Sequence, residues 1–544
     1  MVSTAQPVAG RAASGSGLVL LTLASGQFLM ALDSSVMNVS IATVADDLGT
    51  TVTGIQTAIT LYTLVMASLM ITGGKIGQIL GRKRAFAIGC MIYGCGSLIT
   101  AIAPNLGVLL IGWSVLEGVG AALIMPAIVA LVASNFSRAD RPRAYGLVAA
   151  SGAIAVAVGP LIGGLLTTYA SWRWVFAGEV ILVLGIVVLA RRMADVPADR
   201  GARLDPVGTL LSATGLGLVV FGVIRAGAWG FVSPKPGAPS LFGLSPVLWL
   251  VLTGGLVLLG FLRWERGRQR NGAAVLIDPA MLGNKLLRGG LTSFFFQYLL
   301  QAGLFFVVPL FLSIAMGLSA VDTGLRILPL SIALLASAVG IPKLFPDVSP
   351  RLVVRLGFLS LFVGIVSLAA ALEVGVQAAV VTWPMLFAGL GIGALASQLG
   401  SVTVSAVPDE QSAEVGGLQN TVTFLGASIG TALAGAVLIS ALSSSFFTGI
   451  ADNPAIPRQL SSQAQVDLAG GVPFIPDDKL DEALTAAGVA GTTKAEIVDE
   501  NQAARLDGLR AALGVLAVIA LIALFVANGV PRRQPHDAEP VNPP

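Results

Sequence analysis

Long apolar segments alternate with short polar ones along the 544 residues of this chain. At about 1.5 Å of rise per residue, residues 17–41 are long enough to cross a hydrocarbon core of roughly 30 Å as a helix. Thirteen further apolar segments follow at 52–73, 85–103, 107–133, 144–168, 174–190, 206–224, 245–264, 289–315, 321–342, 353–372, 379–405, 414–442 and 508–529. The pattern predicts fourteen membrane spans, with both ends of the chain on one side.

The composition supports a membrane protein. Hydrophobic residues make up 55% of the chain and charged residues 11%, whereas soluble domains carry roughly 25% charged residues. The 65 glycines suit closely packed membrane helices. The lipid bilayer is therefore an expected partner, and nucleic acid is not, because the basic residues are spread over many loops.

Several kinds of chemistry are excluded by residue type. The single histidine, His536, lies in the polar C-terminal tail, and Cys90 and Cys95 lie five residues apart on different faces of one predicted helix. No G-x-x-x-x-G-K-[ST] motif occurs. We therefore expect no metal site, no cofactor and no enzymatic activity.

Lysine and arginine set the predicted orientation. Twenty-three of the 32 basic residues fall on the termini and on the loops that share their side. Because basic residues are enriched in cytoplasmic loops, the N- and C-termini are predicted to be cytoplasmic. The 65-residue loop 443–507 then lies outside, where it is either a solvated cap or a gating or partner-binding loop.

Acidic residues inside the spans are the candidates for function. Asp33 lies past the midpoint of the first span, where a carboxylate costs about 2.5–3.5 kcal/mol at the bilayer centre on insertion scales. Such acids face a bundle interior or a wet cavity, although a structural acid bonded to a neighbouring Ser or Asn is the alternative. Glu117 lies among small residues and is either a proton carrier or permanently protonated. Glu179 lies near the outer end of its span and is either a further proton carrier or a residue that reaches only the interface.

Two glycine-containing motifs stand out. The segment after the second span reads GKIGQILGRKR from Gly74 to Arg84, which alone is compatible with an ordinary basic loop. The fifth span contains Gly159-Pro160-Leu161-Ile162-Gly163-Gly164, and such a sequence kinks a membrane helix and permits close packing.

Together these motifs resemble the major facilitator superfamily, in particular its fourteen-span drug:proton antiporter group. The resemblance assigns one set of residues to motif A, the gating loop: Gly74, Gly77, Gln78, Gly81, Arg82 and Lys83. It assigns another set to motif C, the antiporter helix: Gly159, Pro160, Gly163 and Gly164. Segments 32–39, 172–176, 204–206 and 229–230 are similar to further signatures of the group.

The resemblance implies an all-α polytopic membrane protein with the major facilitator fold and fourteen transmembrane helices. Two six-helix bundles, residues 17–190 and 289–529, would surround a central cavity, with two inserted helices at 206–264. Residues 1–16 and 530–544 would form a cytoplasmic leader and tail. Transport would proceed by alternating access, with one bundle rocking against the other.

Three departures from the family pattern concern charge. Gln78 stands where motif A has an acid, so the latch between the bundles is expected to be a neutral hydrogen bond at best. Ser114 stands where the fourth span has an arginine, and Glu117 and Glu179 are additional acids. A carboxyl group in a medium of low dielectric constant is easier to protonate, so these acids are candidate proton carriers.

The candidates for proton or substrate coupling form one set: Asp33, Asn38, Glu117, Glu179 and Arg326. Asp322 and Arg326 are four residues apart on one helix face, where an exposed ion pair of little value is the alternative. Gln297, Tyr298 and Gln301 are candidates for a cavity wall, although the neighbouring phenylalanines also suit a lipid-facing surface. Glu414, Gln419 and Asn420 look like gate or capping residues.

The sequence thus predicts a secondary active exporter of small amphipathic compounds in exchange for protons, of the multidrug efflux type. It would lie in a bacterial cytoplasmic membrane, as a monomer. An exporter or flippase of a lipid or other hydrophobic metabolite is the first alternative. A membrane sensor or scaffold that no longer transports is the second, suggested by Gln78 and Ser114.

Overall fold

The computed structural model describes residues 12–50, 52–137, 139–193, 198, 202–235, 237–408, 411–468, 471–472, 474–489 and 491–533. Helices form almost all of the regular structure in these residues, with one isolated β-bridge between Leu241 and Leu244. The leader and tail predicted at 1–16 and 530–544 lie mostly outside the described residues.

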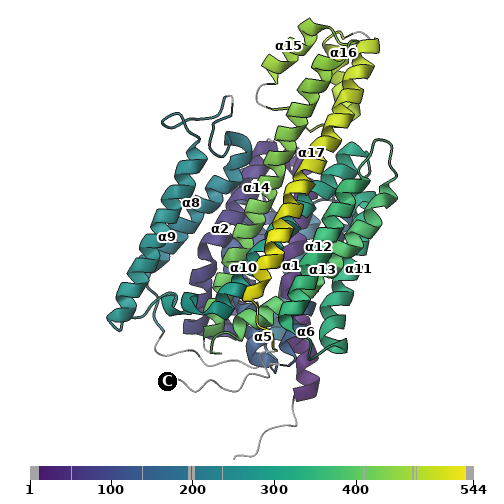
Figure 1. Ribbon diagram of the computed structural model, residues 1–544. Helices are drawn as coiled ribbons and strands as arrows, with labels where there is room; N and C mark the ends of the chain where they lie inside the picture. The colour runs from purple at the N-terminus through teal and green to yellow at the C-terminus, as the bar shows by residue number, and fades with distance from the viewer. Residues whose placement is uncertain are drawn as a thin grey trace, which may run out of the picture.

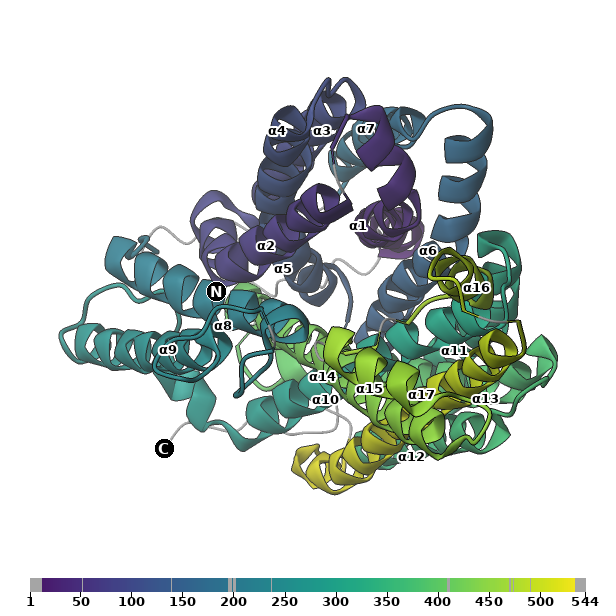
Figure 2. The same ribbon diagram turned by 90° about the horizontal axis from the view of Figure 1, so that it is seen from above.

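The first group of helices forms the N-terminal bundle (Figures 1 and 2). Within it α1 packs mainly on α6, while α3 packs on α5 and α7. The segments α4, η1 and α5 follow one another directly as one helix. The elements are α1 (Ala12–Asp47), α2 (Val52–Leu80), α3 (Arg82–Ala101), α4 (Leu106–Leu109), η1 (Leu110–Glu117), α5 (Gly118–Asn135), α6 (Arg141–Tyr169) and α7 (Arg173–Ala190).

Two helices, α8 (Pro206–Trp229) and α9 (Pro246–Arg270), pack on each other at the side of the molecule (Figure 2). Each begins with proline at its first position, after an N-cap side chain that accepts a backbone N–H: Asp205 for α8 and Ser245 for α9. The contacts of α8 reach both α2 and the C-terminal α14. The inserted pair therefore lies against both halves of the protein.

The remaining helices form the C-terminal bundle, in which α10 packs on α14, and α13 on α11 and α12. The elements are η2 (Pro279–Gly283), α10 (Lys285–Leu310), η3 (Phe311–Ala315), α11 (Ala320–Leu344), α12 (Pro350–Ala371), η4 (Ala378–Val381), α13 (Thr382–Val404), α14 (Ser412–Asp452), α15 (Arg458–Asp467), α16 (Asp477–Ala486), α17 (Gly491–Val526) and η6 (Ala527–Gly529).

Thirteen helices within the described residues are long and apolar enough to cross a membrane. The helix α6, which is described only in part, is 29 residues long and is the fourteenth. Each bundle has its own large cluster of buried apolar side chains. The predicted all-α, fourteen-helix fold with two bundles and two inserted helices is confirmed.

Two predicted boundaries are wrong. Residues 74–80 are the last two turns of α2, because the helix continues through the motif to Leu80. The turn is confined to Gly81, whose φ of 93° lies in the left-handed region that favours glycine. The predicted loop 443–507 is mostly helical, since α14 extends to Asp452 and α17 begins at Gly491.

These extensions form a folded cap together with α15 and α16 (Figure 1). The cap has a small apolar core that includes Phe446, Ile450 and Ile497. Arg505, of which only 1% is exposed, pairs with Asp477 and donates to the Ile475 carbonyl at 2.8 Å. Buried apolar and charged contacts of this kind hold the cap in one arrangement.

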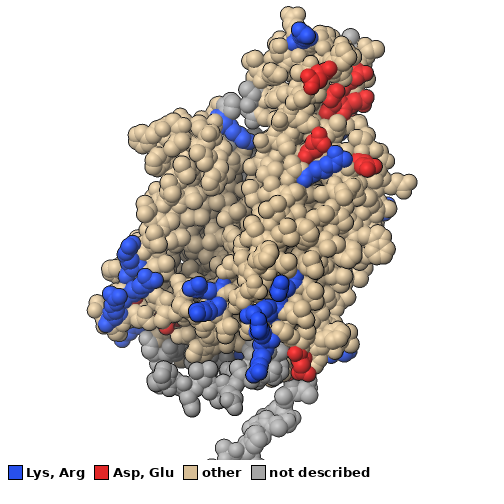
Figure 3. Space-filling view, viewed as in Figure 1, with Lys and Arg blue, Asp and Glu red and all other residues tan. Residues whose placement is uncertain are grey.

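Charged side chains lie mainly at the two ends of the molecule (Figure 3). Acidic residues, among them Asp452, Asp478 and Glu482, are exposed on the cap. Basic residues gather at the opposite end, which we call the basic end. Its exposed members include Arg263, Arg266, Arg270, Lys285 and Arg288.

Single cysteines test the orientation of the two ends. In a background without Cys90 and Cys95, Gln463→Cys on the cap should react with an impermeant reagent added to intact cells, and Ala139→Cys at the basic end should not. Both positions are exposed in the structure, and the basic end should be cytoplasmic because basic residues are retained there. Labelling of both cysteines from the same side would contradict the topology.

Candidate functional site

Three acids from three helices meet inside the N-terminal bundle. Asp33 comes from α1, Glu117 from η1 and Glu179 from α7, and one carboxylate oxygen of each lies within 4.8 Å of the others. None of the three is more than 1% exposed. Of the two alternatives for Glu179, a position only at the interface is therefore wrong, because its helix turns this side chain towards α1 and α3.

Donors from neighbouring helices satisfy one oxygen of each acid. The Trp113 indole N–H donates to Asp33 Oδ1 at 2.7 Å, and the Ser97 hydroxyl donates to Glu179 Oε2 at 3.1 Å. The Thr100 hydroxyl lies 3.4 Å from Glu117 Oε1. No cation lies among these contacts within the described part of the chain.

The other oxygen of each acid has no hydrogen-bond partner among the described residues. The hydroxyls of Tyr62 and Tyr93 lie around Asp33, and neither makes a hydrogen bond of ordinary geometry. Tyr62 stacks on Trp113, with ring centroids 5.1 Å apart. Oxygens at this spacing would also suit a cation bound by oxygen ligands, so the absence of a metal site stays a prediction.

A π-helical segment and two close glycine contacts bring the backbone around Glu117 near the other acids. Residues Leu110–Glu117 form a π-helical segment, a feature frequent at functional sites. A Cβ at Gly96 would lie 2.6 Å from Glu117 Cγ, and one at Gly112 would lie 2.7 Å from the Thr100 hydroxyl. These glycines let α3 and η1 approach closely enough for the acids to meet.

The glycines of the predicted motif C pack α6 on α1. A Cβ at Gly159 would collide with Ser35, and one at Gly163 would lie 2.9 Å from Val36. Gly164 has open space around it, and the side chain of Pro160 lies outside the described residues. The motif therefore holds α6 against the helix that carries Asp33.

A cavity of about 190 Å³ lies between the two bundles. Its wall includes Gln297, Tyr298 and Gln301, the three residues predicted for it, and also Phe294. On the N-terminal side it includes Gln27 and Ala31 of α1, Tyr145 and Gly152 of α6, and Met125 of α5; on the C-terminal side it includes Gln419, Asn420 and Thr423 of α14. The three acids are not part of this wall.

The structure does not bring the other two coupling candidates, Arg326 and Asn38, to the acid cluster within its described residues. Arg326 is exposed on α11, in the other bundle, and the structure describes no ion pair between it and Asp322. Asp322 instead accepts a hydrogen bond from Ser319 at 2.7 Å. The side chain of Asn38 lies outside the described residues.

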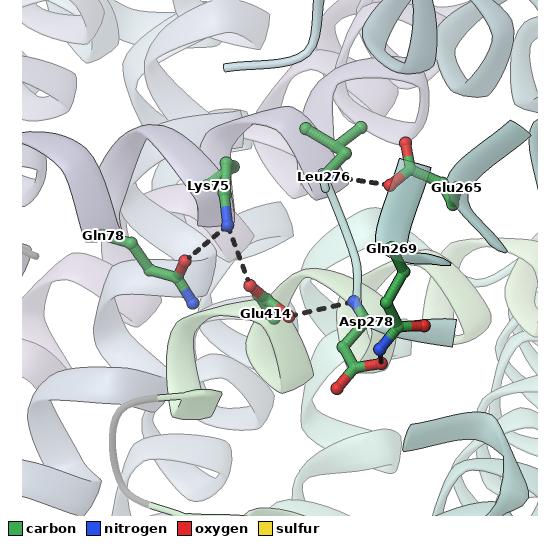
Figure 4. A network of polar contacts seen from close by, with 7 residues as sticks. All are labelled: Lys75, Gln78, Glu265, Gln269, Leu276, Asp278 and Glu414. Carbon is green, nitrogen blue, oxygen red and sulfur yellow. Dashed lines mark hydrogen bonds and ion pairs between the residues drawn. The ribbon is translucent and has the colours of Figure 1, made fainter. Parts of the chain in front are cut away.

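An ion pair joins the bundles at the basic end (Figure 4). The Lys75 ammonium on α2 lies 3.1 Å from Glu414 Oε1 on α14, and both residues are buried. Lys75 also donates to Gln78 Oε1 at 3.0 Å. The expected neutral latch is therefore wrong, because Lys75, which the resemblance did not include in motif A, pairs with an acid from the other bundle. We call the Lys75–Glu414 contact and its surroundings the basic-end gate.

The bundles also approach closely around this gate. A Cβ at Gly146 on α6 would lie 2.5 Å from the Ala338 carbonyl oxygen on α11, and one at Gly417 on α14 would lie 3.0 Å from the Met70 carbonyl oxygen on α2. Backbone contacts of this kind leave no room for a substrate to pass. The basic end is closed in this structure.

The other motif A residues named here lie on α2 and α3 of the N-terminal bundle. Gly74 and Gly77 are buried on α2, and Arg82 is buried at the start of α3. Lys83 donates to the Arg191 carbonyl at 2.8 Å and to the Met193 carbonyl at 2.7 Å, at the C-terminal end of α7. Through these two contacts Lys83 caps a helix within its own bundle.

Comparison with known proteins identifies the family. A model of the Major Facilitator Superfamily matches residues 23–431. The chain belongs to this superfamily. It is a membrane transporter, not an enzyme, and an integral membrane protein.

Several curated relatives match most of the chain. The chain is 30% identical to puromycin resistance protein pur8 of Streptomyces alboniger, over 76% of this chain and 80% of that protein. It is 26% identical to the multidrug efflux pump LfrA of Mycolicibacterium smegmatis, over 97% and 98%. It is also 26% identical to the tetracenomycin C resistance and export protein of Streptomyces glaucescens, over 96% and 93%.

Solved structures show the same fold. The human organic anion transporter MFSD10 superposes with a TM-score of 0.57 at 13% identity, covering 96% of this chain and all of that one. The proton:xylose symporter XylE superposes with a TM-score of 0.55, also at 13% identity, covering 96% of this chain and 99% of that one. At this identity the likeness concerns the fold alone.

Gln78→Asp tests the gate. The new carboxylate, three residues from Lys75 on the same helix, should compete with Glu414 for the ammonium and favour opening of the basic end. One hydrogen bond is worth about 1 kcal/mol, so we expect the open population to rise about fivefold. The measurement is double electron–electron resonance between spin labels at Ala139 and Asp347, which are exposed on basic-end loops of the two bundles. Gln78→Glu introduces the same charge on a longer side chain and should act in the same direction. Wild-type distances in both variants would show that Gln78 has no part in the gate.

Proposed function

We propose that the protein exports small amphipathic compounds in exchange for protons, and that Asp33, Glu117 and Glu179 carry the proton together. Its relatives include proteins named for multidrug efflux and for antibiotic resistance and export. That supports efflux as the direction of transport. The proton site is proposed from the geometry of the three acids.

The observation that carries the proposal is the burial of three carboxyl groups within 4.8 Å of one another. Like charges at such distances repel strongly in a medium of low dielectric constant, and no basic side chain compensates them among the described contacts. The group must therefore hold protons when closed off from water and release one when water reaches it. Because the three sites interact, they titrate as one group.

Helix α1 is the proposed link between the proton site and the substrate cavity. Gln27 and Ala31 line the cavity, whereas Asp33, on another face of the same helix, joins the acid cluster. A change of charge at Asp33 would alter its contact with Trp113 and shift α1 against α6. The cavity wall would then change with the protonation state.

The transport cycle follows from the closed gate. Opening the basic end requires the Lys75–Glu414 pair to separate and the bundles to rock apart around the cavity. We place the basic end in the cytoplasm of a bacterium and the cap outside, as a multi-pass protein of the cytoplasmic membrane. Substrate would enter from the cytoplasmic side and leave on the side of the cap, and a monomer contains every part of this route.

A lipid or other hydrophobic metabolite is the second candidate substrate. An apolar groove of about 360 Å³ between α11, α12 and α13, lined by Leu344, Phe345 and Leu356 among others, favours it. Transport of cationic dyes and of labelled lipid into everted vesicles distinguishes the two classes. The charged latch of Lys75 and Glu414 removes one of the two reasons for considering a protein that no longer transports.

Asp33→Asn tests the proton site. Asparagine resembles the protonated acid in shape and still accepts the Trp113 N–H, so the fold should persist. Export driven by a pH gradient in everted vesicles should fall at least tenfold, because the cluster loses its exchangeable charge at α1. Asp33→Glu should retain part of the activity with a shifted pH dependence.

Asp47→Asn is the matched control, because Asp47 lies on the same helix outside the cluster and pairs with Arg173. The Arg173 hydrogen bond lowers the pKa of the Asp47 carboxyl, so this acid stays ionised during transport and its variant should export normally. Wild-type export by Asp33→Asn would show that the coupled proton binds elsewhere. If Asp33→Asn is not monodisperse, absence of substrate-stimulated proton release from the purified wild-type protein would overturn the proposal.

A further inference from the structure

We propose that the inserted pair α8–α9 is part of the basic-end gate, and that Glu265 is a positioning residue for Glu414. The proposal concerns how the gate is held closed, and it does not depend on proton coupling at the acid cluster. It rests on a continuous set of contacts from α9 through residues 276–278 to the ion pair between the bundles.

The first contact is made by Glu265, which is completely buried near the end of α9. Its Oε2 accepts the Leu276 backbone N–H at 2.7 Å (Figure 4). Its Oε1 faces α8, where a Cβ at Gly208 would collide with it. A buried carboxylate is unfavourable unless it is paired or hydrogen-bonded, so two helices that only separate the bundles would not require one at this position.

Asp205 fixes the same end of the pair. Its carboxylate accepts the Trp264 indole N–H at 2.7 Å and lies 3.3 Å from the Arg268 Nε, both on α9. It also caps α8 by accepting the Val207 N–H at 3.2 Å. The basic-end termini of α8 and α9 therefore form one rigid unit. From this unit Glu265 reaches residues 271–284 between α9 and α10, which we call the connection.

The connection reaches the gate through its backbone. Two residues after Leu276, the Asp278 N–H lies 3.3 Å from Glu414 Oε2, while the other oxygen of Glu414 binds Lys75 (Figure 4). Glu414 thus has its two oxygens held from opposite sides, by the connection and by α2. Fixing Leu276 fixes Asp278, and Asp278 orients the carboxylate that holds the bundles together.

Apolar packing accompanies these polar contacts. One cluster of buried side chains joins Ile71 of α2, Leu216 of α8, Phe261 of α9 and the connection residues Leu276 and Ile277. Leu418 and Leu425 of α14 pack against the same cluster. The inserted pair therefore bridges both bundles beside the ion pair, and opening the gate must break or shift this packing.

The test compares Glu265→Ala with Glu265→Gln in the full-length protein carrying spin labels at Ala139 and Asp347. Alanine removes the acceptor for the Leu276 N–H, and we expect the open population to rise about fivefold, at the lower end of typical coupling between sites. Glutamine keeps an acceptor oxygen and should restore the wild-type distances. A merely structural role for Glu265 would change stability in the alanine variant without changing the distances.

Gln269→Ala is the matched control. Gln269 also contacts the connection, but its amide donates to the half-buried Asp278 side chain at 2.7 Å and not to the backbone that faces Glu414. It should leave the distances unchanged. The proposal is overturned if Glu414→Ala opens the basic end while Glu265→Ala does not. Because the measurement involves no transport, a failure of the proposed proton site would not affect it.

A converse measurement covers the case in which Glu265→Ala does not fold. Coupling between two sites is reciprocal, so Lys75→Ala should loosen the connection as well as the bundles. Hydrogen–deuterium exchange over residues 274–284 should then be about fivefold faster than in the wild type. Unchanged exchange in this segment, with faster exchange in α2 and α14, would show that the connection is independent of the gate and would overturn the proposal.

Discussion

A charge buried in a membrane-spanning protein must be paired, hydrogen-bonded or neutralised, and this constraint accounts for both polar centres of the molecule. At the basic-end gate the constraint is met by pairing, because Lys75 and Glu414 meet across the bundles. In the N-terminal bundle three acids meet without a described basic side chain, and we propose that protons neutralise them. The same rule thus gives a latch in one place and a candidate proton site in the other.

Two helices relate these centres to the cavity. On α1, Gln27 and Ala31 line the cavity while Asp33 joins the acid cluster. On α14, Asn420 lines the cavity while Glu414 holds the gate. Each helix therefore touches the substrate space and one polar centre, so a movement of either helix alters both. Glycines of α6 pack closely on side chains of α1, and glycines of α14 pack on the α10 backbone, so a movement of α1 or α14 also involves its neighbouring helix.

Where the chain departs from the family pattern, charged side chains are lost at some positions and present at others. Gln78 replaces the acid of motif A, yet the latch remains ionic because its acid, Glu414, comes from the other bundle. Ser114 replaces the arginine of the fourth span and donates to the Ala58 carbonyl at 2.8 Å. Glu117 and Glu179 add two acids to the bundle that lacks this arginine, and these two meet Asp33 in the group that we propose to bind protons.

The number of spans and the identity of the unusual acids followed from local composition, whereas the two-bundle fold followed from the resemblance of the sequence motifs to the family. Whether a twenty-residue segment is apolar enough to cross a bilayer is a property of that segment alone. Only the tertiary structure decided which side chains meet. Lys75 and Glu414 are 339 residues apart in the chain, and the sequence left open whether Glu179 reaches the bundle interior or only the interface. The physical reason is that lipid is as apolar as leucine, so a helix that is apolar all round carries little information about which face meets protein.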